Sequence, residues 1–140
     1  MQLKVKKLDT GLPDLQYARE GDAGFDLYAR EAVTLAPSEW KVIPTGMSFE
    51  IPNGYVGLIW DKGGLSIKNA LKTLGGVVDA GYRGEVMVGM INLGSAPYTF
   101  ERGHKVAQLL IQKVEQVSFG YTDTLSDTDR AESGFGASGK

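Results

Sequence analysis

The sequence predicts an all-β protein with one short helix and a mobile C-terminal arm. Short apolar or alternating runs recur about every 8–12 residues between residues 3 and 112, a spacing typical of a sandwich or barrel of short strands. Residues that favour turns lie between these runs. The chain of 140 residues contains 19 glycines, which suits short strands joined by tight turns.

The first half of the chain is expected to form six strands. Residues 3–8 alternate apolar and polar side chains, as a half-buried strand does. After a loop at residues 11–14, the expected strands are residues 24–28, 33–35, 40–43, 47–51 and 55–60. Turn formers such as Pro37, Pro44 and Pro52 separate the later strands.

The second half contains the only segment that resembles a helix, residues 65–72. Apolar runs at residues 77–78 and 86–88 then flank a glycine-rich turn, which predicts either a β-hairpin or a sharp corner between two strands. A strand over residues 85–91, a turn at residues 92–97 and a strand over residues 105–112 complete the expected core.

The composition changes after Ser118, where the chain becomes polar, acidic and then glycine-rich. Most such ends are simply solvated. Phe135 stands between Gly134 and Gly136, however, and an arm that closes over a ligand would use such an aromatic ring. We therefore divide the chain into a β domain of residues 1–118 and an arm of residues 119–140.

Composition excludes several kinds of function. The chain has no cysteine and a single histidine, His104, so thiol chemistry and a histidine-cluster metal site are excluded. We expect His104 to lie in an exposed turn without a chemical role. The formal charge of −2 and the lack of a basic block give no reason to expect a nucleic-acid partner. Short apolar runs and an N-terminus without a signal-peptide pattern predict no membrane association and a cytoplasmic location.

Five segments carry the candidate functional residues: AGFDLY (23–28), DKGGLS (61–66), GVVDAGYRGE (76–85), GHKVAQ (103–108) and RAESGFGASG (130–139). In this order they resemble the motifs of the trimeric dUTP diphosphatases (dUTPases). The resemblance extends from about residue 23 to the C-terminus. It implies a jelly-roll β-fold and a homotrimer whose active sites lie between subunits, each closed by the arm of a neighbour.

The resemblance also implies a reaction, the hydrolysis of dUTP to dUMP and pyrophosphate, which limits uracil incorporation into DNA and supplies dUMP for thymidylate synthesis. Attack on the α-phosphorus needs an oriented water, a base, a cation and hydrogen-bond donors around the phosphates. Mg²⁺ is the implied cofactor, because it binds mostly through phosphates and water and needs no direct side-chain ligand here.

Three residues are predicted to be catalytic. Asp79 matches the family position that orients the attacking water, a role open to a carboxylate when no histidine or cysteine is at hand. Considered alone, Asp79 could equally be a turn former beside a glycine. Asp26 resembles the acid that supports the magnesium and water network without direct ligation. Gln108 resembles the amide that holds phosphates and water; otherwise it is a polar residue on a strand face.

The base and sugar are expected near residues 74–82. Backbone groups that include Gly76 and Val78 resemble those that read uracil, and the close backbone approach that glycine permits would reject thymine. Tyr82 resembles the ring that packs under deoxyribose and excludes a 2′-hydroxyl; otherwise it is an ordinary strand aromatic. Thr73 stands where many family members have asparagine, so a side-chain contact to the base differs here.

Lys62, Gly63 and Gly64 resemble the phosphate-binding loop of the family, in which backbone N–H groups precede a short helix. The commonest pattern has arginine and serine at the first two positions. Lys62 keeps the charge but loses the bidentate fork of arginine, and Gly63 removes a hydroxyl.

The arm carries three further predicted contacts to substrate. Arg130 resembles the γ-phosphate ligand, Phe135 together with Gly136 the lid over uracil, and Ser138 an additional phosphate donor. Stacking and a guanidinium contact would order the arm only when substrate is present.

The sequence leaves two alternatives to the hydrolysis of dUTP. The dCTP deaminases share this fold but carry a glutamate on the strand after the glycine-rich turn, and residues 86–92 contain no acid. A nucleotide-binding regulatory protein, with catalysis weakened at Lys62 and Gly63, is the second alternative.

Overall fold

The computed structural model describes residues 1–134, which contain eleven strands and one short helix. The strands are β1 (Lys4–Lys7), β2 (Gly24–Tyr28), β3 (Val33–Leu35), β4 (Trp40–Pro44), β5 (Met47–Glu50), β6 (Tyr55–Trp60), β7 (Leu71–Leu74), β8 (Val77–Val78), β9 (Met87–Asn92), β10 (Tyr98–Phe100) and β11 (Lys105–Lys113). The helix is α1 (Gly63–Asn69). The all-β prediction with one short helix is confirmed.

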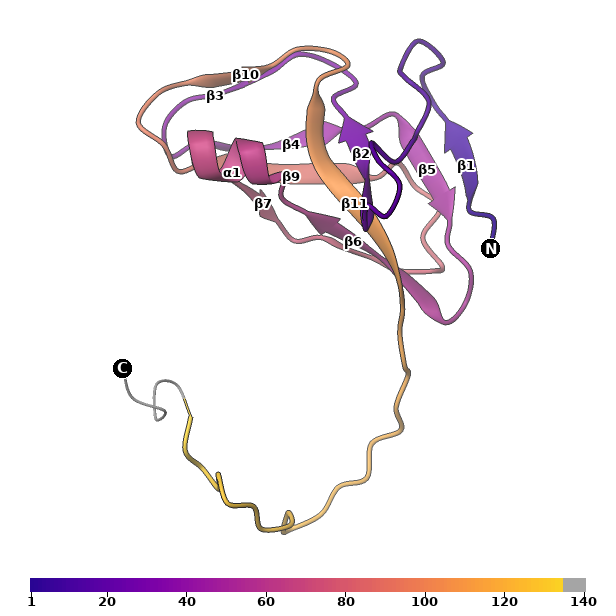
Figure 1. Cartoon of the computed structure of the whole chain (residues 1–140), viewed down its shortest axis with the longest axis vertical. Coiled ribbons are helices and arrows are strands. Elements are labelled where there is room, and N and C mark those ends of the chain that lie inside the picture. The colour runs from indigo at the N-terminus through magenta and orange to yellow at the C-terminus, as the bar shows by residue number, and fades with distance from the viewer. Residues whose placement is uncertain (135–140) are drawn as a thin grey trace.

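The strands pair antiparallel in four small sheets (Figure 1). The largest has the order β2-β11-β6-β8, and a second has the order β4-β9-β7. The pairs β1-β5 and β3-β10 form two further two-stranded sheets. No sheet closes into a barrel within residues 1–134, so the arrangement is an open, jelly-roll-like sandwich.

The core lies between these sheets and is made of inward-facing residues from nearly every strand. Along β9, for example, Val88 and Met90 are buried while the residues between them are more exposed, as expected when one face of a strand meets the core. The largest fully buried side chains include Phe100, Leu27, Leu35, Ile43 and Leu109. No helix in the described part of the chain is long and apolar enough to cross a bilayer.

The predicted helix over residues 65–72 is wrong at its C-terminal end. The helix stops at Asn69 because Ala70 adopts a left-handed conformation (φ 54°) as the C-cap. Leu71–Leu74 then forms β7, where Leu71 and Thr73 are buried and their neighbours are exposed. This alternation matches the period of a strand rather than that of a helix.

The glycine-rich turn joins two sheets and does not form a hairpin. β8 pairs with β6, whereas β9 pairs with β4 and β7. Of the two predicted arrangements, a sharp corner between strands is confirmed and a hairpin is wrong. We call residues 75–85 the glycine corner.

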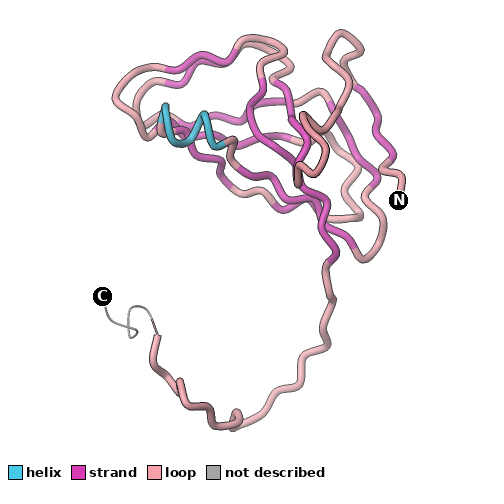
Figure 2. Tube along the Cα trace, viewed as in Figure 1, coloured by secondary structure: helices cyan, strands magenta, loops and turns pink. Residues whose placement is uncertain are grey.

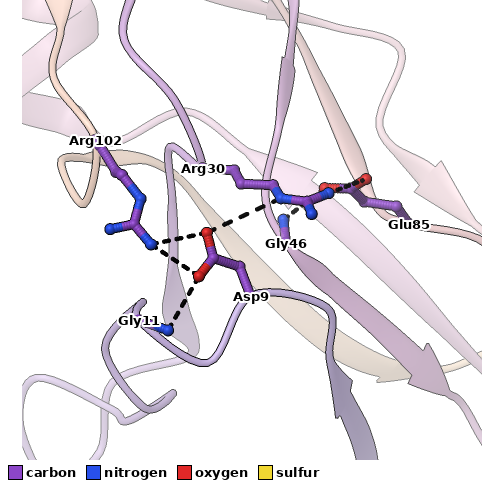
Figure 3. Close-up of polar contacts among 6 residues, drawn as sticks. All are labelled: Asp9, Gly11, Arg30, Gly46, Glu85 and Arg102. Atoms are coloured by element: carbon purple, nitrogen blue, oxygen red, sulfur yellow. Dashed lines mark hydrogen bonds and ion pairs between the residues drawn. The ribbon is translucent and has the colours of Figure 1, made fainter.

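A charged cluster ties the end of the glycine corner to the N-terminal loop (Figure 3). The carboxylate of Glu85 accepts the backbone N–H of Gly46 at 2.7 Å and an Arg30 N–H at 3.2 Å. Arg30 also faces Asp9 at 4.0 Å, and Asp9 accepts two hydrogen bonds from Arg102. These hydrogen bonds from Arg102 are the main reason why the pKa of Asp9 lies below its ordinary value. The end of the corner is therefore bound directly by Arg30 and Gly46, and Arg30 connects it to Asp9.

Beyond β11 the chain runs away from the sheets as an extended arm (Figures 1 and 2). Val114 donates its backbone N–H to Gly54 at 2.9 Å, at the point where the arm departs. The apolar side chains that follow are strongly exposed: Val117 by 68%, Phe119 by 80%, Tyr121 by 98% and Leu125 by 87%. The described part of the arm thus leaves apolar surface uncovered on a single chain.

Candidate active site

The glycine corner lines a pocket of about 230 Å³. Its lining residues are Ile59, Gly76, Val77, Val78, Asp79, Tyr82, Val86 and Met87. Four of the predicted site residues, namely Gly76, Val78, Asp79 and Tyr82, therefore share one concave surface, and we call them the corner group. Most of the lining residues are apolar in type, and Asp79 is the one charged residue among them, a combination common in small-molecule sites.

Gly76 determines the shape of this pocket through its backbone. Its φ is +125°, which side chains rarely tolerate, and a Cβ at this position would lie 2.8 Å from the carbonyl oxygen of Ile59. Its own carbonyl accepts the N–H of Ile59 at 2.7 Å. Gly76 therefore packs directly on the backbone of β6, which accounts for a glycine at this position. Val78 turns its side chain into the core, so only its backbone faces the pocket.

Asp79 and Tyr82 are held together by the turn itself. The carbonyl of Asp79 accepts the N–H of Tyr82 at 3.0 Å, and the Tyr82 hydroxyl donates to the carbonyl of Glu85 at 2.9 Å. The ring of Tyr82 is 47% exposed, so it belongs to the pocket wall rather than to the core. The carboxylate of Asp79 is exposed at the end of β8 and is accessible to water or ligand.

A second set of predicted residues gathers at the far end of β6. Asp26, Lys62, Gly63, Gly64 and Gln108 lie there, and we call them the loop group. In the four-stranded sheet Gln108 lies opposite Asp26 on one side and opposite Trp60 on the other. The sheet therefore brings the first, second and fourth sequence motifs together.

Asp26 is the acid of the loop group, and its side chain is only 7% exposed. One carboxylate oxygen accepts a hydrogen bond from Lys62, and the other accepts one from Lys105 at 2.6 Å. Burial raises the pKa of Asp26, but the two ammonium groups outweigh it and hold the pKa below its ordinary value. The same contact raises the pKa of Lys105. Asp26 is therefore a charged group in the folded protein at neutral pH.

Asp61, which directly precedes Lys62 in the chain, accepts three hydrogen bonds. Its carboxylate accepts the N–H of Thr73 at 2.7 Å and the ammonium of Lys72 at 2.6 Å. Its carbonyl accepts the side-chain amide of Gln108 at 2.9 Å. Burial raises the pKa of Asp61, but its contacts with Lys72 and Thr73 bring the pKa below its ordinary value.

The loop itself leads into α1. Lys62 is the N-cap in an extended conformation (φ −84°, ψ 123°), and Gly63 and Gly64 begin the helix. The first N–H groups of a helix have no acceptor within it, so these two glycines present backbone donors. Gly63 does not have a positive φ, and a Cβ there would meet no heavy atom within 4 Å.

The corner group and the loop group do not meet within one chain. Continuing the pairing of β8 with β6 places Asp79 opposite Val56, while Asp26 lies two strands away from Trp60 at the other end of β6. Ordinary strand spacings put the two carboxylates roughly 15–20 Å apart.

Sequence reasoning missed three charged residues at the loop group: Asp61, Lys72 and Lys105. Asp61 and Lys105 lie inside the motifs, but their partners are distant in the sequence. Lys72 was assigned to the predicted helix and lies on β7 instead. Thr73 is buried, with its hydroxyl 3.4 Å from the ammonium of Lys72.

In the arm, the side chain of Arg130 donates to the carbonyl of Ser133 at 2.8 Å, a local contact. The predicted contacts at Phe135, Gly136 and Ser138 lie outside the described residues. Within residues 1–134, no three His, Cys, Asp or Glu side chains come together as a metal site. His104 is exposed in a turn, as predicted.

Together these features define a jelly-roll-like protein that combines a backbone-built pocket with a cationic loop, chemistry suited to a nucleoside and its phosphates. The dUTPase family model matches residues 11–139. The chain belongs to the dUTPase family.

Curated relatives and solved structures agree with this assignment. Deoxyuridine 5'-triphosphate nucleotidohydrolase of Thermobifida fusca is 42% identical, over 99% of this chain and 79% of the relative. The protein of that name from Mycolicibacterium gilvum is 45% identical, over 98% of this chain and 94% of the relative. A dUTPase of Staphylococcus bacteriophage 80alpha with bound dUpNHpp has a TM-score of 0.93 and 29% identity, with 99% of both chains covered. A phage phi11 dUTPase that coordinates a structural Mg(II) ion has a TM-score of 0.80 and 26% identity, over 89% of this chain and 98% of that one.

Proposed function

We propose that this protein hydrolyses dUTP to dUMP and pyrophosphate. The observation that carries the proposal is the pocket of the glycine corner, in which Gly76, Asp79 and Tyr82 share one concave surface. Membership of the dUTPase family and the names of the curated relatives support the same reaction. Such an enzyme limits the supply of dUTP for DNA synthesis and produces dUMP.

In this proposal the corner group binds the nucleoside. Backbone groups at Gly76 and Val78 pair with uracil, and close approach of this backbone to ring C5 leaves no space for the methyl group of thymine. The hydrogen bond between Gly76 and Ile59 holds the backbone of Gly76 on β6. The ring of Tyr82 packs under the deoxyribose, fixed by the bond from its hydroxyl to Glu85. Asp79 accepts a proton from the attacking water and aligns it with the α-phosphorus. The water oxygen becomes part of dUMP, and pyrophosphate leaves.

The loop group binds the phosphates. Lys62 supplies a positive charge, the N–H groups of Gly63 and Gly64 supply donors, and Gln108 holds the start of the loop through its bond to Asp61. Because Lys62 contacts Asp26 in the free protein, phosphate must compete with that carboxylate for the ammonium group. Lys105 continues to balance the charge of Asp26 when Lys62 turns to the phosphates.

Mg²⁺ fits this arrangement as a cofactor held mainly by the substrate. The exposed Asp79 and the charged Asp26 are oxygen donors of the kind that a hydrated magnesium ion contacts through water. Magnesium would neutralise charge on the phosphates. Asp26 would then orient waters of the ion rather than bind it directly.

We further propose a homotrimer with active sites between subunits. The separation of Asp79 from Asp26 within one chain supports it, because a neighbouring copy could complete the site. Exposed apolar side chains on the described strands, such as Trp40 at 61% and Trp60 at 55%, are suited to burial between copies. The extended arm, with Phe119 and Tyr121 uncovered, is suited to crossing onto a neighbour and bringing Arg130 and residues 135–138 to its site.

Hydrolysis in ¹⁸O-labelled water tests the proposed reaction. Attack at the α-phosphorus puts the label into dUMP and leaves the pyrophosphate unlabelled, as mass spectrometry of both products would show. Label in the pyrophosphate would contradict the proposed site of attack. Binding of dUTP without any dUMP production would favour a nucleotide-binding regulatory protein instead. Deamination is not proposed, since β9 carries no acidic residue.

A further inference from the structure

The loop that carries Lys62 has little packing to fix its position. A Cβ atom added at Gly63 or at Gly64 would have no heavy atom within 4 Å. The helix that follows, α1, has no fully buried residue, and only Leu65 packs partly against the core. The N-cap Lys62 makes no side-chain capping bond. Polar contacts at the start of the loop therefore contribute strongly to its position.

Asp61 supplies most of those contacts. Its two carboxylate oxygens accept from two adjacent residues of β7, the backbone N–H of Thr73 at 2.7 Å and the ammonium of Lys72 at 2.6 Å. Its side chain is 19% exposed, so water competes only weakly for these bonds. Hydrogen bonds to a charged group are stronger than those between neutral groups.

β7 is a firm anchor for this contact. All four of its residues pair with β9, which in turn pairs with β4 in the same sheet. Leu71 and Thr73 are buried, at 1% and 6% exposure. We call residues 62–64 the glycine loop. When one end of the Asp61 contact moves, the glycine loop therefore moves and the strand does not.

We propose that Asp61 is a positioning residue for phosphate binding: it fixes the glycine loop on β7 so that Lys62 and the N–H groups of Gly63 and Gly64 face the phosphate chain. This inference rests on the proposed function. Asp61 itself touches neither substrate nor metal. Its effect is expected on the phosphate chain of the nucleotide and not on the base, because the corner group is built from other contacts.

The test compares two ligands in the full-length protein, dUMP and the non-hydrolysable dUpNHpp, by isothermal titration calorimetry with Mg²⁺ present. In Asp61→Ala the affinity for dUpNHpp should fall about tenfold, the amount expected for one lost hydrogen bond to a charged group. The affinity for dUMP should stay within about twofold of the parent, since dUMP lacks the β- and γ-phosphates.

Two further variants make the test specific. Asp61→Asn keeps the oxygen that accepts the N–H of Thr73 but loses the charge facing Lys72, so it should recover part of the dUpNHpp affinity, and it remains informative if Asp61→Ala does not fold. Glu50→Ala removes a carboxylate that pairs with Lys4 at 2.9 Å on the exposed edge of the fold. This control should bind both ligands like the parent.

Parental affinity of Asp61→Ala for dUpNHpp would overturn the inference. Equal losses for both ligands, with a lower melting temperature, would also overturn it, because Asp61 would then act on stability alone. If the parent protein binds dUpNHpp but produces no dUMP from dUTP, the proposed reaction fails while the role of Asp61 in positioning the loop stands.

Discussion

The corner group and the loop group lie on the same sheet but are built by different kinds of interaction. At the corner, the backbone determines the shape: Gly76 has a φ of +125° and packs on the carbonyl of Ile59. In the loop group, charged side chains determine it, with Asp26 between Lys62 and Lys105. The pocket at the corner is therefore formed before substrate arrives, whereas the loop must exchange an internal ion pair for a contact with phosphate. Specificity for the base and affinity for the phosphates should respond to different mutations.

The largest effect is expected at the corner, from Asp79→Asn. Loss of the proposed base should lower turnover by about 10²–10⁴ while the nucleotide affinity changes only a few-fold. Steady-state kinetics and calorimetry with dUpNHpp would measure the two quantities. Asp14→Asn, at a side chain that is 92% exposed, is the matched control and should behave like the parent. Parental turnover in Asp79→Asn would remove Asp79 from the reaction.

Removal of residues 131–140 tests whether the corner group and the loop group support catalysis without the end of the arm. Stacking of an aromatic ring on a base contributes about 1–3 kcal/mol, so loss of the lid proposed at Phe135 and of the proposed phosphate donors should lower kcat/KM by about a hundredfold. The sheets and the proposed trimer should persist, because the deleted segment contains few apolar side chains. Analytical ultracentrifugation would check the oligomer. A truncated protein with full activity would show that the arm has no part in catalysis.

Tyr82→Ala should alter selectivity and leave phosphate binding intact. A pocket that rejects an extra hydroxyl discriminates by about a hundredfold at most, so the preference for dUTP over UTP should fall by about tenfold or more. Tyr82→Phe keeps the ring but loses the bond to the carbonyl of Glu85, and it should retain most of the preference. Competition between the two nucleotides would measure the ratio. An unchanged ratio in Tyr82→Ala would exclude the ring from the sugar pocket.

The smallest effect is expected in the loop group, from Gly63→Ser. Because Gly63 has no positive φ and a Cβ there meets nothing within 4 Å, the fold accepts a serine without strain. A hydroxyl bonded to a phosphate oxygen contributes about 1.5–3 kcal/mol when it is well placed, so hydrolysis should accelerate by about tenfold. Gly120→Ser, in the arm, is the control. Slower hydrolysis at an unchanged melting temperature would show that backbone N–H groups already satisfy the phosphates.

The same contrast explains what could be predicted from the sequence. The bounds of β2, β3 and β6 match the prediction because alternation along a strand is a local pattern. The sequence does not predict β7, because its start depends on the left-handed conformation of Ala70. Alanine rarely adopts that conformation, so the residue type gives no sign of it.

The candidate site divides in the same way. The approach of the Gly76 backbone to the base stays a prediction, and the contact that the structure shows is with Ile59 of β6. The pairing of Lys62 with Asp26 joins residues 36 positions apart, and the pairing of Arg30 with Glu85 joins residues 55 positions apart. Contacts of this kind are created by the packing of strands, so no local pattern contains them. The roles of the site residues in catalysis remain predictions.

We expect the glycine corner, whose shape is determined by its backbone, to select uracil and deoxyribose before hydrolysis takes place. Pyrophosphate release from dUTP, dTTP, dCTP and UTP, measured side by side with Mg²⁺ in the parent protein, tests it most directly. We predict a kcat/KM for dUTP about a hundredfold above that for dTTP and dCTP, and about tenfold to a hundredfold above that for UTP. Hydrolysis of dTTP or dCTP at a rate similar to that of dUTP, or no pyrophosphate release from dUTP, would contradict it.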